Sequence, residues 1–247
     1  MAKTSGLGDN LYVGGYDLSN DVGSLGTIGG GVAPLEVTGI DKSAFERIGG
    51  LRDGRIEYNA FLNTAADKAH DRLGNLPTTD TILPYCRGTT LGNPAAMLVG
   101  KQLSYDGTRA ADGGIAFDVS EPGNGFGLEW GRQLTPGQQL LGAAGAGTGV
   151  DFTAATAFGA QAYVHVMLFT GTSCTFTLQD FTADTPASYA NITGGASVAM
   201  TAIGSQRWAT ANTQTIRRWV RVNVTGTFSA LLFAVSVVKN DVAGQLF

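Results

Sequence analysis

The chain has 247 residues, of which 43% are hydrophobic, 15% are charged and 36 are glycine, and its formal net charge is −4. Such a chain is ordered rather than intrinsically disordered, because disorder needs low hydrophobicity and high charge. The charge excludes the basic footprint that sequence-independent nucleic-acid binding requires. The length suits one large β domain or two of ordinary size.

The charge is divided unevenly along the chain. Residues 1–135 hold 16 acidic and 11 basic side chains, whereas residues 136–247 hold 4 and 5. The N-terminal MAKTSGLGDN contains no apolar core and predicts no signal peptide, and no segment approaches the ~18 apolar residues of a membrane-spanning helix. We therefore expect no membrane partner, and synthesis and folding in a cytoplasm.

The N-terminal quarter predicts an arm followed by two strands. Residues 1–31 are rich in glycine and predict a mobile arm. Residues 35–61, LEVTGIDKSAFERIGGLRDGRIEYNAF, predict a strand, a one-turn helix at 43–48, a break at Gly49-Gly50 and a second strand. Asp53-Gly54 predicts a turn, since glycine tolerates positive φ and aspartate bonds its own backbone.

Residues 55–60 alternate between polar and apolar side chains. Arg55, Glu57 and Asn59 fall on one face of a strand, and Ile56, Tyr58 and Ala60 fall on the other. This period of two predicts a half-buried strand.

A change of composition in the middle of the chain predicts a domain boundary. The segment PGQQLLGAAGAGTGV, residues 136–150, is rich in glycine and alanine and shows no strand pattern. The division expected is a β domain with an N-terminal arm at 1–135, a linker at 136–149 and a β-sandwich domain at 150–247. A long loop inside one domain is the alternative.

The second half predicts two hairpins. Strands at 162–170 and 174–179 flank a polar turn at 171–173, and strands at 216–224 and 227–239 flank Thr225-Gly226. The last strand, TFSALLFAVSVVK, is apolar on both faces. It should therefore lie centrally in a sheet or be covered by another subunit, because an exposed strand of this kind would aggregate.

Few residues are suited to catalysis or metal binding. The two histidines, His70 and His165, lack the neighbours of a nucleophile–base arrangement, and His165 in a strand pattern predicts a packed or interface histidine. Asp67, His70 and Asp71 could share a helical face and hold a metal, but a solvated charged turn is the preferred interpretation. Cys86 and Cys174 could form one disulfide. We expect no enzyme, cofactor or metal site.

Several of these segments resemble the major tail proteins, or tail tube proteins, of long-tailed bacteriophages. The resemblance rests on YDLSNDVGSL and residues 35–61 in the first half. In the second half it rests on FGAQAYVHV, TFTLQDFTAD and RRWVRVNVTGTFSALLFAVSVVKN, which are similar to those of phages of actinobacteria. It covers about Leu11 to Asn240. The chain is longer than tube proteins with one tube domain, so an extra or duplicated domain is expected.

The resemblance implies an all-β fold: a tail-tube-like β-sandwich or barrel with a short helix, plus a second β-sandwich domain. It implies a structural subunit of the virion tail, forming stacked rings that conduct the genome. Six chains, or three in a pseudo-hexamer, would form a ring. Other implied partners are the tape measure and terminator proteins, and genomic DNA passing through the lumen without specific binding.

The implied tube suggests two sets of site residues. An acidic lumen would repel DNA phosphates and let the duplex slide. The lumen-facing candidates are Asp41, Glu46, Asp53 and Glu57. The candidates for packing between subunits are Trp219, Phe228 and Phe233.

Two other classes of function stay open at this point. A two-domain β-sandwich binding module, recognising a glycan or receptor on a virion or cell surface, could use Trp208, Trp219 and Tyr163 as an aromatic platform. An enzyme that uses His70 or His165 has the weakest support.

Overall fold

The structure is a computed structural model of the chain, and it describes residues 5–242. Strands dominate it, with one short α-helix and one 3-10 turn, so the predicted all-β fold class is confirmed. Within residues 5–242, no helix has the length and apolar character needed to cross a membrane.

The chain divides into two compact units that interleave in sequence. Unit 1 comprises the described parts of residues 1–20, 82–97 and 129–247, and unit 2 comprises residues 21–81 and 98–128. This division differs from the contiguous one expected from composition, because the chain leaves unit 1 twice and returns to it.

Unit 1 is built on a twelve-stranded sheet, and a 3-10 turn, η1 (Pro186–Ser188), precedes β14. The strands of this sheet are β1 (Asn10–Val13), β2 (Tyr16–Asp17), β5 (Thr81–Cys86), β6 (Pro94–Gly100), β9 (Glu129–Gln133), β10 (Gln139–Leu141), β11 (Gly145–Ala146), β12 (Val150–Asp151), β13 (Ala160–Phe181), β14 (Ala190–Ala196), β15 (Gly204–Ala209) and β16 (Trp219–Lys239).

The two hairpins predicted in the second half are wrong. Each predicted hairpin is one continuous strand, β13 or β16, and the two strands pair antiparallel from Ala160↔Lys239 to Phe181↔Trp219. The residues expected to form turns lie opposite one another as β-bulges, near Gly171↔Phe228 and Cys174↔Gly226. A bulge bends a strand without reversing it.

Glycine is required at this bend because the two backbones approach each other closely. A Cβ at Gly171 would lie 2.4 Å from the carbonyl oxygen of Thr227, and a Cβ at Gly226 would lie 2.2 Å from that of Ser173. Gly226 also has φ of 126°, a conformation that L side chains rarely adopt. The glycines that suggested turns therefore permit the close approach of two long paired strands at their bend.

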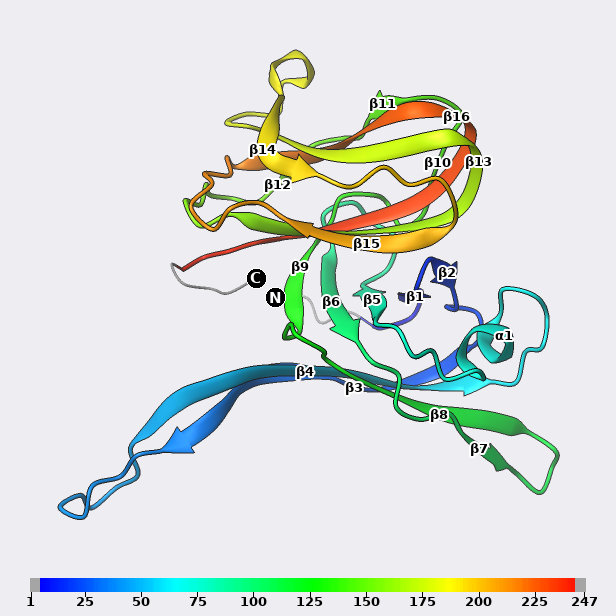
Figure 1. Cartoon of the computed structure of the whole chain (residues 1–247), viewed down its shortest axis with the longest axis vertical. Helices are drawn as coiled ribbons and strands as arrows, with labels where there is room; N and C mark the ends of the chain where they lie inside the picture. Colours follow the sequence, from blue (N-terminus) through cyan, green and yellow to red (C-terminus); the bar gives the residue numbers. More distant parts are fainter. Residues whose placement is uncertain (1–4, 243–247) are drawn as a thin grey trace. The chain divides into compact units, whose positions relative to one another are not determined.

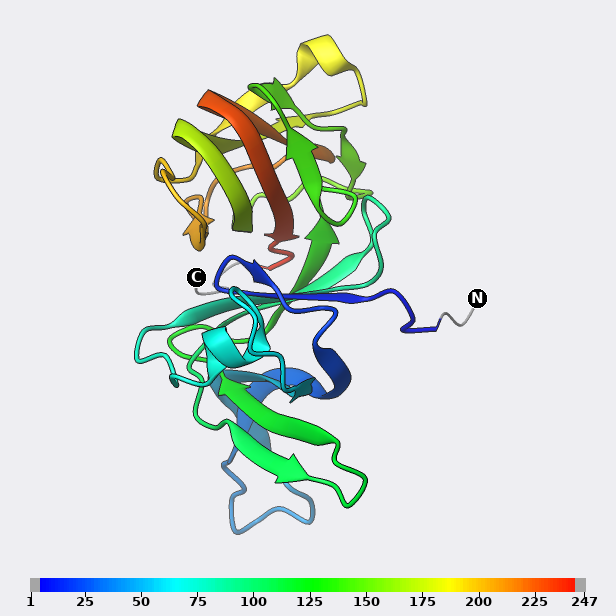
Figure 2. The ribbon, with the colours of Figure 1, turned by 90° about the vertical axis from the view of Figure 1, so that its right-hand side faces the viewer.

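The bend folds the sheet over on itself, as Figures 1 and 2 show. By register, Phe176 lies opposite Val224 and Phe233 opposite Val166, far apart along the strands. Their ring centroids are nevertheless 5.2 Å apart. Both halves of β13 and β16 therefore face each other across one hydrophobic core, which gives the predicted sandwich.

The segment predicted as a linker is part of the sheet. Within residues 136–149, β10 and β11 pair with β16 through Leu140↔Leu232 and Gly145↔Val224. Short side chains suit these brief pairings along the edge of a bent strand. Because β16 has β13 on one side and β9 to β12 on the other, its predicted central position is confirmed.

Unit 2 carries a four-stranded sheet in the order β3-β4-β8-β7 and one short helix. Its elements are β3 (Val22–Glu36), β4 (Arg47–Phe61), α1 (Ala69–Leu73), β7 (Asp106–Arg109) and β8 (Ile115–Pro122). The start of β3 lies within the stretch predicted as a mobile arm.

The details predicted between Leu35 and Phe61 need correction. Residues 43–48 form no helix, and β4 begins at Arg47 and runs through Gly49-Gly50 without a break. Asp53-Gly54 is mid-strand, paired with Gly31 and Gly30. Gly54 is needed there for close approach, since its Cβ would lie 2.3 Å from the Leu128 nitrogen.

The helix α1 is held at its start by a distant carboxylate. The backbone N–H of Ala69 donates to Asp21 Oδ2 at 3.0 Å, and Asn63 Nδ2 donates to Asp21 Oδ1 at 2.8 Å. At the other end, Gln102 donates to the Leu73 carbonyl at 2.8 Å. These bonds fix a helix of five residues that is too short to be stable alone.

Candidate assembly surface

The central strand of unit 2 separates an apolar from a polar face. Ile56, Tyr58 and Ala60 are buried, which confirms the alternation predicted from sequence. Their neighbours Glu57 and Asn59 lie on the opposite, accessible face. Alternation along β4 also places Asp53 on that face.

The accessible face continues across β8 and is polar around Glu57 and Asn59, although Phe61 at the end of β4 is exposed on it. Glu57 lies opposite Ser120, and Asn59 lies opposite Asp118, to which its Nδ2 donates at 2.9 Å. These side chains line a shallow hollow of about 350 Å³. Arg55 Nε lies 3.9 Å from Glu57 Oε1, but the pair is exposed and therefore weak.

The buried face contains one ionisable pair. Tyr58 on β4 donates a 2.8 Å hydrogen bond to Glu121 Oε1 on β8, and Glu121 is fully buried. Burial raises the pKa of Glu121 to about 7, although the hydrogen bond from Tyr58 opposes that shift. The pKa of Tyr58 is raised by burial and by the neighbouring carboxyl.

Both outer edges of this sheet lack a partner strand within the described residues. The edge strands are β3 on one side and β7 on the other. A strand edge presents unpaired N–H and C=O groups, which favour pairing with another chain. Unit 2 therefore has a surface suited to continuing its sheet into a neighbouring molecule.

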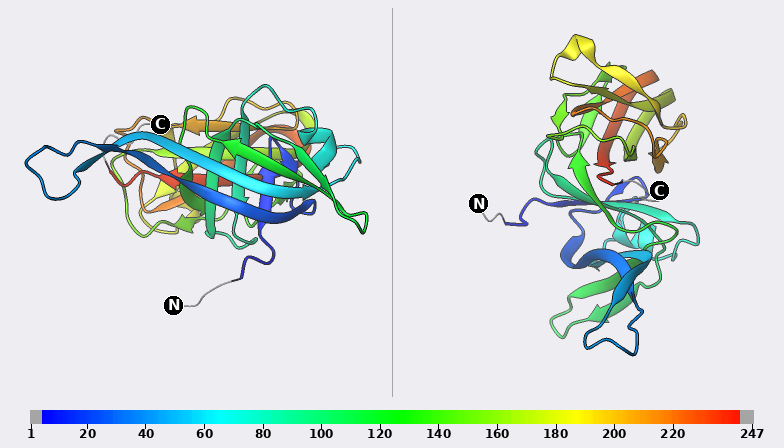
Figure 3. Two further views of the ribbon diagram at one scale, coloured as in Figure 1. Left: turned by 90° about the horizontal axis from the view of Figure 1, so that it is seen from below. Right: turned by 90° about the vertical axis from the view of Figure 1, so that its left-hand side faces the viewer.

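The β3–β4 hairpin extends beyond the rest of the sheet as a two-stranded ribbon (Figure 3). Because β8 pairs with β4 only over residues 55–61, residues 47–54 pair with β3 alone. A two-stranded ribbon is marginal by itself in water. Large hydrophobic side chains nevertheless stand exposed along it and at its tip: Val32, Leu35, Val37, Ile40, Phe45, Ile48 and Leu51.

The tip of the ribbon has little internal stabilisation. Val37 donates to the Glu46 carbonyl at 2.9 Å, and Lys42 forms an exposed 3.4 Å ion pair with Glu46. The Arg47 guanidinium stands 4.9 Å from the centroid of the Phe45 ring. Exposed apolar groups with so few contacts are typical of a surface that another molecule covers.

The four acidic candidates fall into two groups. Asp53 and Glu57 lie on the accessible face of the sheet, whereas Asp41 and Glu46 lie at the ribbon tip. Sequence reasoning missed Asp118, which joins the first group through Asn59. Its strand, β8, alternates Phe117 and Val119 with Asp118 and Ser120, a signal of a strand that could have been used, but nothing in the sequence identifies β4 as its partner.

Two of the three candidates for packing between subunits are core residues. Phe233 is 1% exposed against Phe176, and Phe228 is 9% exposed. Neither presents its ring to a neighbour, because the folded-over sheet covers both. Trp219 stays half-buried, with the Arg218 guanidinium 5.9 Å from the centroid of its ring.

The aromatic platform suggested by Trp208, Trp219 and Tyr163 does not form. Tyr163 is 1% exposed; its hydroxyl donates to Glu129 and accepts from Arg207 Nε at 2.9 Å. A ring held in a buried polar network cannot stack on a ligand.

The two histidines differ in burial: His165 is packed in the interior, whereas His70 is exposed. His165 is buried, accepts a 3.1 Å hydrogen bond from the Gly15 backbone at Nδ1, and has its pKa lowered by burial to about 3, which confirms a packed histidine. His70 lies 3.2 Å from the Tyr105 hydroxyl. Between residues 5 and 242, no group of three or more His, Cys, Asp or Glu side chains could hold a metal.

Both cysteines are free and buried. The disulfide considered from sequence is therefore absent. Burial raises the pKa of the Cys86 thiol to about 12 and that of Cys174 to about 11, so neither has thiolate character.

No model of a known protein family matches the sequence, and no curated protein is similar to it. Two solved phage structures align with 94% of this chain and 99% of their own. The crystal structure of SPP1 Dit, titled a paradigm of the hub adsorption apparatus in phages that infect Gram-positive bacteria, has 11% identity and a TM-score of 0.34. The phage p2 baseplate, in its activated conformation with Sr, has 8% identity and a TM-score of 0.37.

Proposed function

We propose that the chain is a structural protein of a phage tail, and specifically a major tail tube subunit. Its copies would form stacked rings that conduct the genome. The observation that carries the proposal is the four-stranded sheet of unit 2, with both edges open in the described residues and one polar face accessible. The resemblance of the sequence to tail tube proteins supports it independently.

The open edges suggest how a ring would close. Pairing of β3 in one copy with β7 in the next uses two different surfaces, and such a head-to-tail contact gives a ring when the rotation closes. Closure also removes the exposed edges. Among the described residues only unit 2 carries a sheet of this kind, which favours six chains over three.

The polar face would then line the lumen. Asp53, Glu57 and Asp118 lie on it, with Arg55 as a basic neighbour. Acidic groups repel DNA phosphates, so a duplex would pass without specific binding. This role needs no cofactor or catalytic residue.

The ribbon would make contacts between rings. Its exposed apolar side chains would be covered by a neighbouring copy, which would stabilise both the tip and the stack. Other tail proteins, such as the tape measure and terminator, would meet the tube inside and at its end, within the virion tail.

Negative-stain electron microscopy of the purified chain across a concentration series tests the proposal. Rings or tubes with a central channel are the expected result, and their symmetry would give the number of chains. Particles that stay compact and monomeric at the highest concentration would reject the tube.

A further inference from the structure

A single tryptophan stands exposed on the outer side of β9 in unit 1. Glu129 and Gln133 point inward, whereas Trp130 and Arg132 point outward. Trp130 is 53% exposed, and its register partner on β6 is Ala96, whose small side chain leaves the indole uncovered. A flat aromatic face of this size open to solvent is a candidate contact for a ligand.

A hollow of about 310 Å³ opens on one side of Trp130. Its wall includes Phe152, and the cationic groups of Arg132 and Lys239 lie 5.7 and 5.3 Å from the centroid of that ring. Lys239 Nζ also donates to the Arg217 carbonyl at 2.9 Å, which fixes its position. Asp241 adds a carboxylate to the wall.

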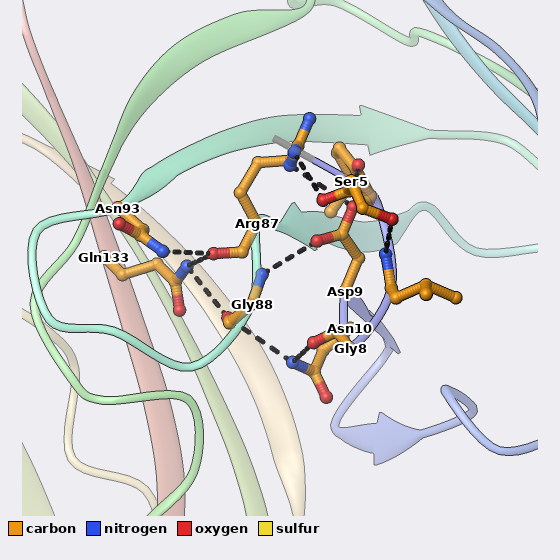
Figure 4. A network of polar contacts seen from close by, with 10 residues as sticks. Ser5, Gly8, Asp9, Asn10, Arg87, Gly88, Asn93 and Gln133 are labelled. Atoms are coloured by element: carbon orange, nitrogen blue, oxygen red, sulfur yellow. Dashed lines mark hydrogen bonds and ion pairs between the residues drawn. The ribbon is translucent and has the colours of Figure 1, made fainter. Parts of the chain in front are cut away.

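A second hollow, of about 520 Å³, also borders Trp130. Asp9, Arg87 and Asn93 line it and belong to the polar network in Figure 4. Asp9 Oδ1 accepts from the Gly88 nitrogen at 2.9 Å, and Asp9 Oδ2 lies 3.3 Å from Arg87 Nε.

Further bonds hold the rim of the second hollow in place. Asn93 Nδ2 and Gln133 Nε2 both donate to the Arg87 carbonyl, at 2.8 and 3.1 Å. The polar groups beside Trp130 are therefore fixed before any ligand arrives, which lowers the ordering cost of binding.

The two hollows share Pro94 and Trp130, so they adjoin at the indole, and together they make a groove whose lining lies entirely within unit 1. We propose that this groove binds an oligosaccharide, with one sugar ring stacked on Trp130. Each hollow has the size of a ligand site in proteins. A pyranose has an apolar C–H face, which suits the indole, and a rim of hydroxyls, which suits carboxylate, amide and guanidinium groups.

The charges along the groove favour a sugar over a nucleic acid. Asp9 pairs with Arg87, and Asp241 stands in the wall with Arg132 and Lys239. A nucleic-acid groove would instead present unopposed positive charge along the backbone. This site is separate from the assembly surface of unit 2, so it adds a recognition function to a structural protein.

The test compares the full chain with Trp130→Ala on an array of immobilised bacterial oligosaccharides, followed by calorimetry with the soluble sugar that gives the strongest signal. We expect Trp130→Ala to weaken that affinity at least tenfold and Arg132→Ala to weaken it measurably. Trp219→Ala, a matched change at a half-buried tryptophan elsewhere in unit 1, should leave the affinity within about twofold. Because Trp130 is exposed, its removal should leave the circular dichroism spectrum unchanged.

Three results would overturn the proposal. One is the absence of any array signal for the wild-type chain, and another is equal affinity for wild type and Trp130→Ala. The third is a loss of self-association in Trp130→Ala without any saccharide binding, which would assign the indole to a subunit interface.

Discussion

Tyr58 and Glu121 join β4 to β8 through a 2.8 Å hydrogen bond on the buried face of the unit 2 sheet. The accessible side of the same two strands carries Glu57 and Asp118. One pair of strands thus places a carboxyl group with a raised pKa inside the protein and two carboxyl groups on its accessible face. The stability of this sheet should therefore depend on pH.

The first prediction is that Glu121→Gln removes a decline in stability between pH 4.5 and 7. Burial raises the pKa of Glu121 to about 7 from its ordinary 4.5. Over that interval the unfolded chain releases the proton while the folded chain keeps it, so the free energy of unfolding falls as pH rises. The difference corresponds to about 3 kcal/mol, at 1.36 kcal/mol per pH unit.

Urea denaturation of wild type and Glu121→Gln at several pH values measures this difference. His165 acts in the opposite direction between its lowered pKa of about 3 and its ordinary 6.5, so the comparison between the two proteins is the readout. Tyr58→Phe should shift the decline to higher pH, because it removes the bond that lowers the pKa of Glu121. Parallel curves for wild type and Glu121→Gln would contradict the prediction.

The second prediction concerns the bend at which β13 and β16 approach each other closely. Gly226→Ala should lower the free energy of unfolding by at least about 3 kcal/mol, since it combines a positive φ with a contact to backbone. Gly145→Ala on β11 is the matched control, because a Cβ there meets nothing within 4 Å. It should change stability by less than about 0.5 kcal/mol. Equal effects of the two changes in urea denaturation would argue against this close backbone approach at Gly226.

The third prediction separates core aromatics from surface ones. Phe233→Ala should cost about 3–5 kcal/mol of stability, because it opens a cavity against Phe176 in the core of unit 1. Trp219→Ala, at a half-buried position, should cost about 1 kcal/mol. Thermal or urea unfolding of both variants at low concentration gives the comparison. A small effect of Phe233→Ala on the stability of the isolated chain would instead support the original prediction that Phe233 packs between subunits.

Sequence patterns identified much of β4, β13 and β16 as strands, but not how these strands connect or pair. The pattern of Ile56, Tyr58 and Ala60 predicted a buried face of β4, and the apolar residues on both faces of β16 predicted a central strand. The structure confirms both predictions. The sequence reading of Gly171 and Gly226 failed for a physical reason. Glycine permits either a reversal or a close backbone approach, and only the partner strand decides between them.

Side chains whose role depends on a distant partner were the hardest to find. Trp130 sits in a short strand beside glycines, and its exposure follows from Ala96 on β6. Asp118 gains its place on the polar face only through pairing with Asn59. Alternation within β8 places Asp118 on one face of that strand, but no periodicity within β8 or β9 identifies the partner strand.

The fourth prediction is that the ribbon tip serves assembly and not folding. The double change Ile40→Ser with Phe45→Ser should leave the stability of the isolated chain within about 0.5 kcal/mol, because both side chains are exposed. It should shift the onset of rings or tubes to higher concentration. Leu140→Ser, at an exposed position on β10, is the control and should assemble as wild type does. Unchanged assembly of the double variant in electron microscopy and sedimentation would remove the tip from the interface.

The fifth prediction tests which face lines the proposed channel. Glu57→Lys with Asp118→Lys replaces two acidic groups on the accessible face by basic ones, a change of four charges on each copy. Repeated around a ring, it should convert a lumen that repels phosphates into one that retains DNA, with retention that falls as salt rises. Co-sedimentation of assembled protein with short duplex DNA at two salt concentrations measures this, with wild type expected to retain little. Asp151→Lys with Asp184→Lys adds the same charge to unit 1 instead of unit 2. If the unit 1 variant retained DNA as strongly as the unit 2 variant, the polar face of unit 2 would not be the lumen.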